Sequence, residues 1–339
     1  MATPAMAAPA TGAPLRYLYP GWYAVVMGLT GLALAWHRAE PAMGALAAGV
    51  ARALAALAAV VFAVLAVATV LRALRHADAW REDRQHPVRH TFVATLPVAV
   101  MLVATVGVAL LGPHTLTALL WWAGSLGQLA VTVWVLGRWW APSGRTGPVW
   151  AGVTPALFIP VVGNVLAPLG GVPLGHAGWA AAQFGIGLLF WPVVLVLMMV
   201  RIAQHGPWPE RLRPTSFIVI APPAVVGLGA LQLGAAESVA WMCWGMALFG
   251  LLWVGTQWRA LAAVPFGLPH WAMSFPLAAL AALTLRLAAP GSMMLMFAVA
   301  LLALASIVVL GLALATWRGL SEGALLVREP APRPPLASP

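Results

Sequence analysis

The feature that most constrains this chain is its succession of long apolar runs. A bilayer core about 30 Å thick needs roughly 20 apolar residues in a helix that rises about 1.5 Å per residue, and many runs reach that length. Of the 339 residues, 62% are hydrophobic and 8% are charged, whereas a soluble domain carries about a quarter of charged residues. The sequence therefore predicts an all-α polytopic membrane protein, with the lipid bilayer as its surroundings.

The apolar runs, read against their polar breaks, predict ten transmembrane helices. The predicted spans cover residues 20–37, 43–75, 88–112, 115–138, 149–170, 177–203, 215–233, 237–259, 269–288 and 292–317. We expect them to form one membrane domain over residues 19–318. This domain would lie between a disordered Ala/Pro-rich arm at residues 1–18 and a short Pro-rich tail at residues 319–339.

The arginines indicate the orientation of these spans. All 18 basic residues are arginine, and 15 of them fall in the terminal segments and in the loops on one side of the predicted spans. Arg38, Arg52 and Arg286 fall on the other side. Basic loops stay on the cytoplasmic side of a membrane. We therefore expect a multi-pass protein of the inner (plasma) membrane with both termini cytoplasmic.

The composition also argues against several function classes. A Walker-type nucleotide loop needs a lysine, and the chain has none, so ATP-driven pumping by this chain alone is not expected. The eight histidines lie in loops or at span ends, which argues against a bis-histidine haem. No carboxylate pair or nucleophile–base set falls within one region, and Cys243 is expected to be a packed apolar residue. We predict no enzyme activity, cofactor, metal or nucleic-acid partner.

The prolines of the spans alternate along the chain. Proline removes a helical hydrogen bond, which a membrane protein tolerates where neighbouring helices or a water-filled cavity satisfy the freed carbonyl. The residues expected to kink the odd-numbered spans are Gly28, Gly31, Pro97, Pro160, Pro222, Pro223 and Pro276. Among the even-numbered spans, only the sixth has a central proline, Pro192. We therefore expect the odd-numbered helices to be bent and most of the even-numbered helices to be straight.

The spacing of these prolines indicates an internal repeat. The steps from Pro97 to Pro160, Pro222 and Pro276 are 63, 62 and 54 residues, each about the length of one helical hairpin. This regularity predicts five similar hairpins. The odd-numbered helices would form an inner ring around a central pore, and the even-numbered helices would form an outer ring against lipid.

The predicted pore is neutral and only weakly polar. The candidate polar pore residues are Thr30, Thr95, Asn164 and Ser274. The odd-numbered spans contain no Asp or Glu, whereas a proton relay or a sodium-coupled site would be expected to show buried charges. The candidates for a cytoplasmic arginine rim are Arg84, Arg89 and Arg213. A neutral pore with such a rim favours anions, because basic residues raise the local anion concentration.

Five short stretches in these spans resemble the tellurite-resistance/dicarboxylate transporter family (TehA-like proteins), which includes the slow-type anion channels of plant guard cells. The stretches are HPVR at 86–89, GQ at 127–128, VVGN at 161–164, IAPPA at 220–224 and HWAMSFP at 270–276. They occur in the family's order on the third, fourth, fifth, seventh and ninth spans. The similarity extends from about Trp22 to Trp317.

The resemblance implies ten helices in five hairpins, with the odd-numbered helices lining a pore in each subunit of a homotrimer. It also implies that a phenylalanine of the ninth helix plugs the pore at mid-membrane, and the matching residue here is Phe275. Pro276 would bend the helix at that point, and the ring would exclude ions until it rotates or the pore widens. The chain departs from the family in the extra prolines Pro168 and Pro173. We therefore expect its outer pore mouth to differ from that of the family.

Two transport functions stay open at this point. The first is an anion channel or channel-like transporter that passes small monovalent anions such as chloride and nitrate through a pore gated by Phe275. The alternative is a carrier or exporter of dicarboxylate, sulfite or tellurite-type oxyanions. A coupled carrier of a divalent anion would be expected to show buried cations in the lumen, which the odd-numbered spans lack. Loop histidines such as His86 and His90 leave proton coupling open.

Overall fold

The computed structural model describes residues 14–140 and 150–327, and every regular element in these ranges is a helix. Most of the expected N-terminal arm and C-terminal tail lies outside the described residues. Pro14–Tyr17 form a short 3-10 helix, η1. Eight helical stretches are long and apolar enough to cross a membrane, as the sequence predicts for a polytopic membrane protein.

These eight stretches correspond to predicted spans two to four and six to ten. They are α3 (Ala45–Arg75), η3–α5 (Arg89–Leu111), α6 (Thr115–Gly137), α9 (Ala177–His205), η7–α10 (Glu210–Gln232), α11 (Glu237–Gly255), η8–α13 (Leu268–Leu287) and α14 (Met293–Ser321). The predicted boundaries hold to within a few residues. The last helix continues past the expected domain end at residue 318 to Ser321.

The first and fifth predicted spans are not long single α-helices. The first consists of η2 (Pro20–Trp22) and α1 (Tyr23–Arg38), whose 16 residues are short for a full crossing. The fifth is a series of short pieces: η5 (Pro155–Leu157), α7 (Phe158–Val162), η6 (Gly163–Leu166) and α8 (Ala167–Gly171). Its prolines interrupt the α-helical hydrogen-bond ladder. By length alone, the described residues therefore contain eight spans rather than the expected ten.

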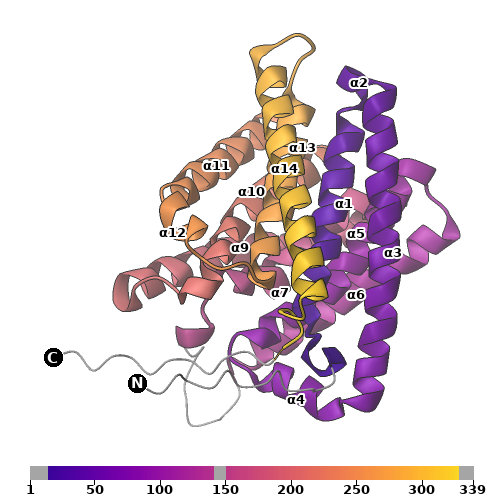
Figure 1. Ribbon diagram of the computed structural model, residues 1–339. Helices are drawn as coiled ribbons and strands as arrows, with labels where there is room; N and C mark the ends of the chain where they lie inside the picture. The colour runs from indigo at the N-terminus through magenta and orange to yellow at the C-terminus, as the bar shows by residue number, and fades with distance from the viewer. Residues whose placement is uncertain (1–13, 141–149, 328–339) are drawn as a thin grey trace.

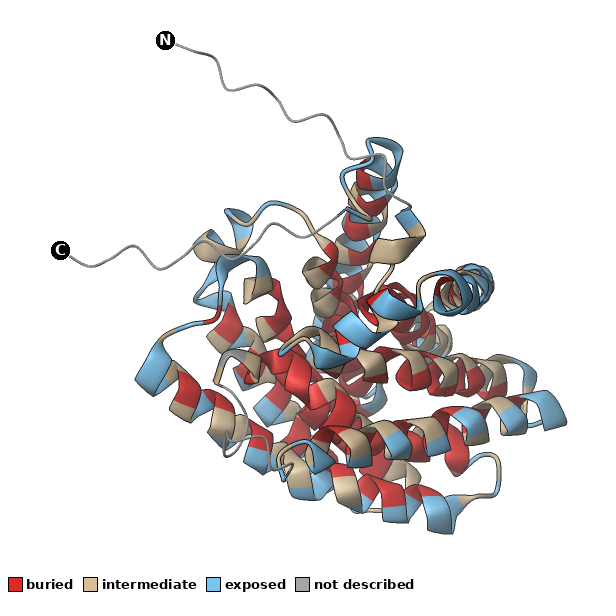
Figure 2. Cartoon of the chain, turned by 90° about the horizontal axis from the view of Figure 1, so that it is seen from below, coloured by how far each residue is buried: buried red, intermediate tan, exposed pale blue. Residues whose placement is uncertain are grey.

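Burial separates the odd-numbered segments from the even-numbered helices. In the most apolar windows of η3–α5, η7–α10 and η8–α13, 61%, 89% and 72% of the residues are buried, whereas the even-numbered helices α3, α6, α9, α11 and α14 range from 11% to 33%. Seen from below, buried residues gather at the centre, and the surrounding helices are buried on one face and exposed on the other (Figure 2). We call the five odd-numbered segments (η2–α1, η3–α5, η5–α8, η7–α10 and η8–α13) the inner segments. We call α3, α6, α9, α11 and α14 the outer helices.

The prolines of the inner segments mark a change of helix type. The 3-10 helices η3 (Arg89–Ala94), η7 (Glu210–Ile220) and η8 (Leu268–Met273) continue directly as α5 (Thr95–Leu111), α10 (Ala221–Gln232) and α13 (Ser274–Leu287), and η5 continues as α7 in the same way. Pro97, Pro160, Pro222, Pro223 and Pro276 are each the second or third residue of the α-helical part. Because proline has no N–H to bond the carbonyl four residues back, the tighter 3-10 pattern precedes it. The expected kinks thus take the form of a switch from 3-10 to α-helix.

The two glycines expected to kink the first span serve a close helix contact instead. Gly28 and Gly31 lie within the continuous helix α1. A Cβ atom on Gly28 would clash with the side chain of Ser274, and one on Gly31 would clash with the ring of Phe275. Their missing side chains therefore let α13 lie against α1.

Side chains of the outer helix α6 support the broken fifth segment. The amide nitrogen of Gln128 donates to the carbonyls of Ile159 and Pro160 at 2.9 and 3.0 Å. The hydroxyl of Thr132 donates to the carbonyl of Pro160 at 2.6 Å. An unpaired carbonyl inside a bilayer costs several kcal/mol, so these donors make a broken helix tolerable in the interior.

A buried chain of hydrogen bonds extends this support to α9. Gln183 donates to the side-chain oxygen of Asn164 at 2.9 Å, and Asn164 donates to the hydroxyl of Thr132 at 2.8 Å. The hydroxyl of Ser125 donates to the side-chain oxygen of Gln183 at 2.6 Å. All four side chains are buried, so the fifth segment is fixed to both outer helices beside it.

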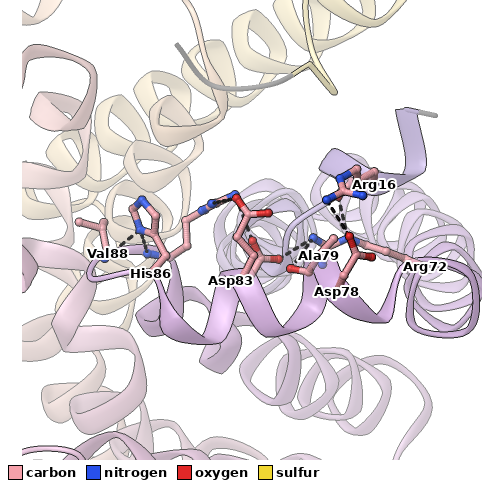
Figure 3. Close-up of polar contacts among 9 residues, drawn as sticks. Arg16, Arg72, Asp78, Ala79, Asp83, His86 and Val88 are labelled. Atoms are coloured by element: carbon pink, nitrogen blue, oxygen red, sulfur yellow. Dashed lines mark hydrogen bonds and ion pairs between the residues drawn. The ribbon is translucent and has the colours of Figure 1, made fainter. Parts of the chain in front are cut away.

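An ion-pair cluster closes one end of the molecule, where the described chain begins and α14 ends (Figure 1). There, α4 (Ala77–Gln85) carries the fully buried Asp83. Its carboxylate lies 2.6 Å from the guanidinium of Arg72 in α3 and 3.1 Å from that of Arg89 in η3 (Figure 3). Burial raises the pKa of the Asp83 carboxyl, and the two arginines act against that rise. We call this the arginine-rich end.

Replacing Arg72 with methionine should destabilise the fold most at alkaline pH. We expect a loss of about 3 kcal/mol in the free energy of unfolding, because a buried carboxylate loses its nearer counter-ion. Without Arg72 the pKa of Asp83 rises further above its value in the unfolded chain. The protonated form stabilises the folded state and is lost as pH rises through the folded pKa, so the deficit should shrink on acidification.

Thermal unfolding of the purified protein in detergent, followed by tryptophan fluorescence at about pH 8 and about pH 5, measures this effect. The control is Arg16→Met, because Arg16 pairs with Asp78 at 2.7 Å but both side chains are largely exposed. That exposed pair should contribute far less to stability than the buried one. Equal losses in the two variants, or a deficit that grows on acidification, would contradict the prediction.

The hydrogen-bond chain predicts a second stability effect. Gln183→Leu leaves Ser125 and Asn164 without their buried partner, so we expect the free energy of unfolding to fall by about 2 kcal/mol. The matched control is Gln257→Leu, since Gln257 is exposed and should change stability by less than about 0.5 kcal/mol. The same fluorescence assay compares the two variants. Similar losses of stability in both would contradict the prediction.

Candidate functional site

The inner segments converge on an apolar cavity of about 80 Å³, which we call the central cavity. Every inner segment contributes to its wall, for example through Met27 of α1, Val98 of α5, Val162 of α7, Pro222 of α10 and Phe275 of α13. No charged side chain lines it. An apolar space of this kind resists wetting.

A second, larger hollow lies at the opposite end of the molecule from α4, where α2 (Glu40–Met43) and the turn between α13 and α14 are found (Figure 1). Its volume is about 850 Å³, and its lining includes the charged residues Arg38, Glu40 and Arg286. We call it the upper hollow. It shares no lining residue with the central cavity, so the two spaces are separate in this structure.

Phe275 belongs to the wall of the central cavity and is 9% exposed. It is the second residue of α13, at the point where the preceding 3-10 helix becomes α-helical. Its ring lies against Gly31 of α1, where an added Cβ would be 2.8 Å from the ring atom Cδ2 and 3.5 Å from the Cβ of Ala278. The ring therefore packs directly against a residue that has no side chain.

The candidate polar pore residues bond to nearby carbonyls and side chains. Thr30 donates to the carbonyls of Val26 and Met27, Thr95 to those of Pro20 and Phe92, and Ser274 to that of Trp271. Asn164 belongs to the chain that links α6 and α9. None of the four lines the central cavity or the upper hollow. Their role in a pore stays a prediction that these contacts do not favour.

The three arginines expected to form a rim lie in different surroundings. Arg89 pairs with Asp83 and, at 3.1 Å, with Glu82, and Arg213 lies 3.5 Å from Glu210. Arg84 is exposed. Carboxylates thus offset the charge of two members of the set, and Arg84 is the member with the most freedom to attract anions from solution.

Two pairs of residues have positions in the structure that the sequence did not predict. Gln128 and Gln183 were given no role, although a polar amide within an apolar run is the signal that marks a buried hydrogen-bond partner. Arg38 and Arg286 entered only as evidence of orientation, and nothing in the sequence showed that one hollow would receive both. Within the described ranges, no group of three or more His, Cys, Asp or Glu residues could hold a metal ion.

Comparison with known proteins gives a consistent assignment. Residues 17–317 match the SLAC1 family, described as voltage-dependent anion channels. The chain is 25% identical to the S-type anion channel SLAH3 of Arabidopsis thaliana over 252 residues, which cover 73% of this chain and 39% of that protein. It is 27% identical to SLAH1 of the same plant over 165 residues, covering 48% of this chain and 42% of that protein.

A bacterial relative aligns over more of its own length. The chain is 25% identical to the tellurite resistance protein TehA homolog of Haemophilus influenzae over 274 residues, 77% of this chain and 78% of that protein. By contrast, the chain spans less than half the length of the two plant relatives. The family match begins in η1, ends in α14 and includes all the inner segments. The chain therefore belongs to the SLAC1 family of voltage-dependent anion channels.

Proposed function

We propose that this protein is an anion channel, or a channel-like anion transporter, for small monovalent anions such as chloride and nitrate, with Phe275 as its gate. The observation that carries the proposal is the convergence of the inner segments on an uncharged cavity whose wall includes the Phe275 ring. The family match supports an anion as the transported species.

The pathway would run along the axis of five helical hairpins. The eight long spans, together with α1 and the broken fifth segment, give ten crossings. Packing supports the hairpins, because α1 contacts α3, α5 contacts α6, α10 contacts α11 and α13 contacts α14, while the pieces of the fifth segment contact α9. The arginine-rich end would be cytoplasmic, in line with the rule that basic loops stay inside. The location in the inner (plasma) membrane stays a prediction, and so does the homotrimer, which the family resemblance implies.

The gate would work by excluding water and hydrated ions. The central cavity has room for only a few water molecules, and an anion that enters it must give up hydration with no charged or amide donor in return. Rotation of the Phe275 ring about its two side-chain torsions would widen this constriction. Because Gly31 has no side chain, none of its atoms blocks the ring on that side.

Phe275→Ala should turn the closed pathway into a conducting one. If the ring supplies at least about 1.4 kcal/mol of the barrier, its removal raises chloride or nitrate flux into proteoliposomes about tenfold or more. The matched control is Phe249→Ala, because Phe249 of α11 is 67% exposed and lies on the outside of the molecule. We expect that substitution to leave the flux unchanged.

The same assay separates the alternative function. The alternative is an oxyanion carrier, which the name of the tellurite resistance protein TehA homolog suggests. A dicarboxylate, sulfite and tellurite are therefore tested beside chloride and nitrate, with and without a proton gradient. Uncoupled chloride or nitrate flux that rises in Phe275→Ala supports the channel. Flux that is unaffected by this substitution, and that requires a divalent substrate and a proton gradient, would replace it with the carrier.

The contact between the ring and Gly31 predicts a coupled stability effect. Gly31→Ala places a methyl group against the Phe275 ring, so we expect the free energy of unfolding to fall by about 2 kcal/mol from overpacking. In the Phe275→Ala background this penalty should disappear. Gly245→Ala on α11 is the control, since nothing lies within 4 Å of a Cβ added there. A penalty that persists without the ring would show that the two residues are not in contact.

A further inference from the structure

The upper hollow brings together two arginines from distant parts of the chain. Arg38 is the last residue of α1, Arg286 is the last but one of α13, and both line the hollow. Arg38 is half-buried and Arg286 is exposed. Two like charges on one hollow repel each other, and an anion between them would relieve that repulsion.

Neither guanidinium has an ion-pair or hydrogen-bond partner in the part of the chain that the structure describes. The carboxylate of Glu40 also lines the hollow, but it lies 2.7 Å from the ring of His37. Each arginine carries +1 and Glu40 carries −1, so these three residues of the lining sum to +1. The arginines with carboxylate partners, by contrast, belong to the arginine-rich end or its neighbourhood: Arg16, Arg72, Arg89 and Arg213.

The positive charge of the two arginines is surrounded by the ends of several helices. The hollow is lined by the last turns of α1, α5, α10 and α13. The C-terminal turn of a helix carries a partial negative charge from its unpaired carbonyls. These turns alone would repel an anion, whereas Arg38 and Arg286 reverse the local sign at the mouth of the hollow.

We propose that Arg38 and Arg286 form a binding site for a small planar oxyanion, such as nitrate or a carboxylate, in the upper hollow. The planar guanidinium fork matches two oxygens of such an anion, which a spherical halide does not offer. The amide of Gln232, at the end of α10, lines the same hollow and supplies a further donor. The volume of about 850 Å³ leaves room for the anion together with part of its hydration shell.

The role of this site in transport rests on the proposed function: an anion would bind here at one mouth of the pathway. Binding itself needs no flux and is measured separately. The experiment is the broadening of the chlorine-35 NMR line of chloride by the purified full-length protein in detergent, with sodium nitrate or sodium formate added to displace the chloride.

The wild-type protein should broaden the line, and nitrate should reverse this broadening. In Arg38→Gln and in Arg286→Gln, the nitrate concentration needed for half-reversal should rise about tenfold, because each substitution removes one charge-assisted donor. Arg52→Gln is the matched control, since Arg52 is exposed on α3 near the same end of the molecule but does not line the hollow. It should behave as wild type.

Arg38→Lys separates the shape of the donor from its charge. This variant should keep chloride binding but lose the preference for nitrate and formate over chloride, because an ammonium group lacks the planar fork. It also carries the test, with Arg286→Gln, if Arg38→Gln fails to fold. The site would be overturned if the nitrate concentration for half-reversal stayed unchanged in Arg38→Lys and Arg286→Gln, or if it changed equally in Arg52→Gln. The two arginines would then only neutralise the partial charge of the helix ends.

The binding result and the flux result are independent. Loss of nitrate binding in the arginine variants together with unchanged flux in Phe275→Ala would uphold the site and reject the gate. A large flux in Phe275→Ala with wild-type anion binding in the arginine variants would uphold the gate and reject the site.

Discussion

Every backbone carbonyl inside a membrane protein must find its hydrogen-bond partner within the protein, and this constraint governs the architecture described here. The inner segments contain prolines that remove backbone donors, yet they are the most deeply buried parts of the chain. The structure resolves the conflict in two ways. The turns before the prolines adopt the 3-10 pattern, and the outer helices α6 and α9 supply side-chain amides and hydroxyls to the fifth segment.

The same arrangement produces the central cavity. Segments that bury most of their residues carry no charged side chain into the centre, so the space where they meet is apolar. The change of helix type in η8–α13 places Phe275 at that space, and the glycines of α1 allow α13 to lie close enough for its ring to reach Gly31. The gate proposed for this protein is therefore a consequence of the way in which the interior avoids unpaired backbone groups.

Charge is excluded from the centre and handled differently at the two ends. At the arginine-rich end, the buried Asp83 joins α3, α4 and η3 through Arg72 and Arg89, so these arginines serve the fold. In the upper hollow, Arg38 and Arg286 belong to the C-terminal turns of α1 and α13, and neither has a carboxylate partner among the described residues. This difference is the basis for assigning ligand binding to the upper pair and structural support to the lower cluster.

The class of protein, the positions of the long spans and the alternation of proline-interrupted and continuous helices could be predicted from the sequence, because these follow from local hydropathy and from the chemistry of proline. The sequence also predicted a helix irregularity at Phe275, because Pro276 follows it, whereas the proposed role of Phe275 came from a family resemblance. Other features became clear only from the packing of the helices. Inner segments are apolar on all sides, so periodicity could not show that Asn164 belongs to the chain between α6 and α9. Nor could it show that Arg38 and Arg286 share one hollow, since contacts between residues so far apart in sequence depend on how the helices pack.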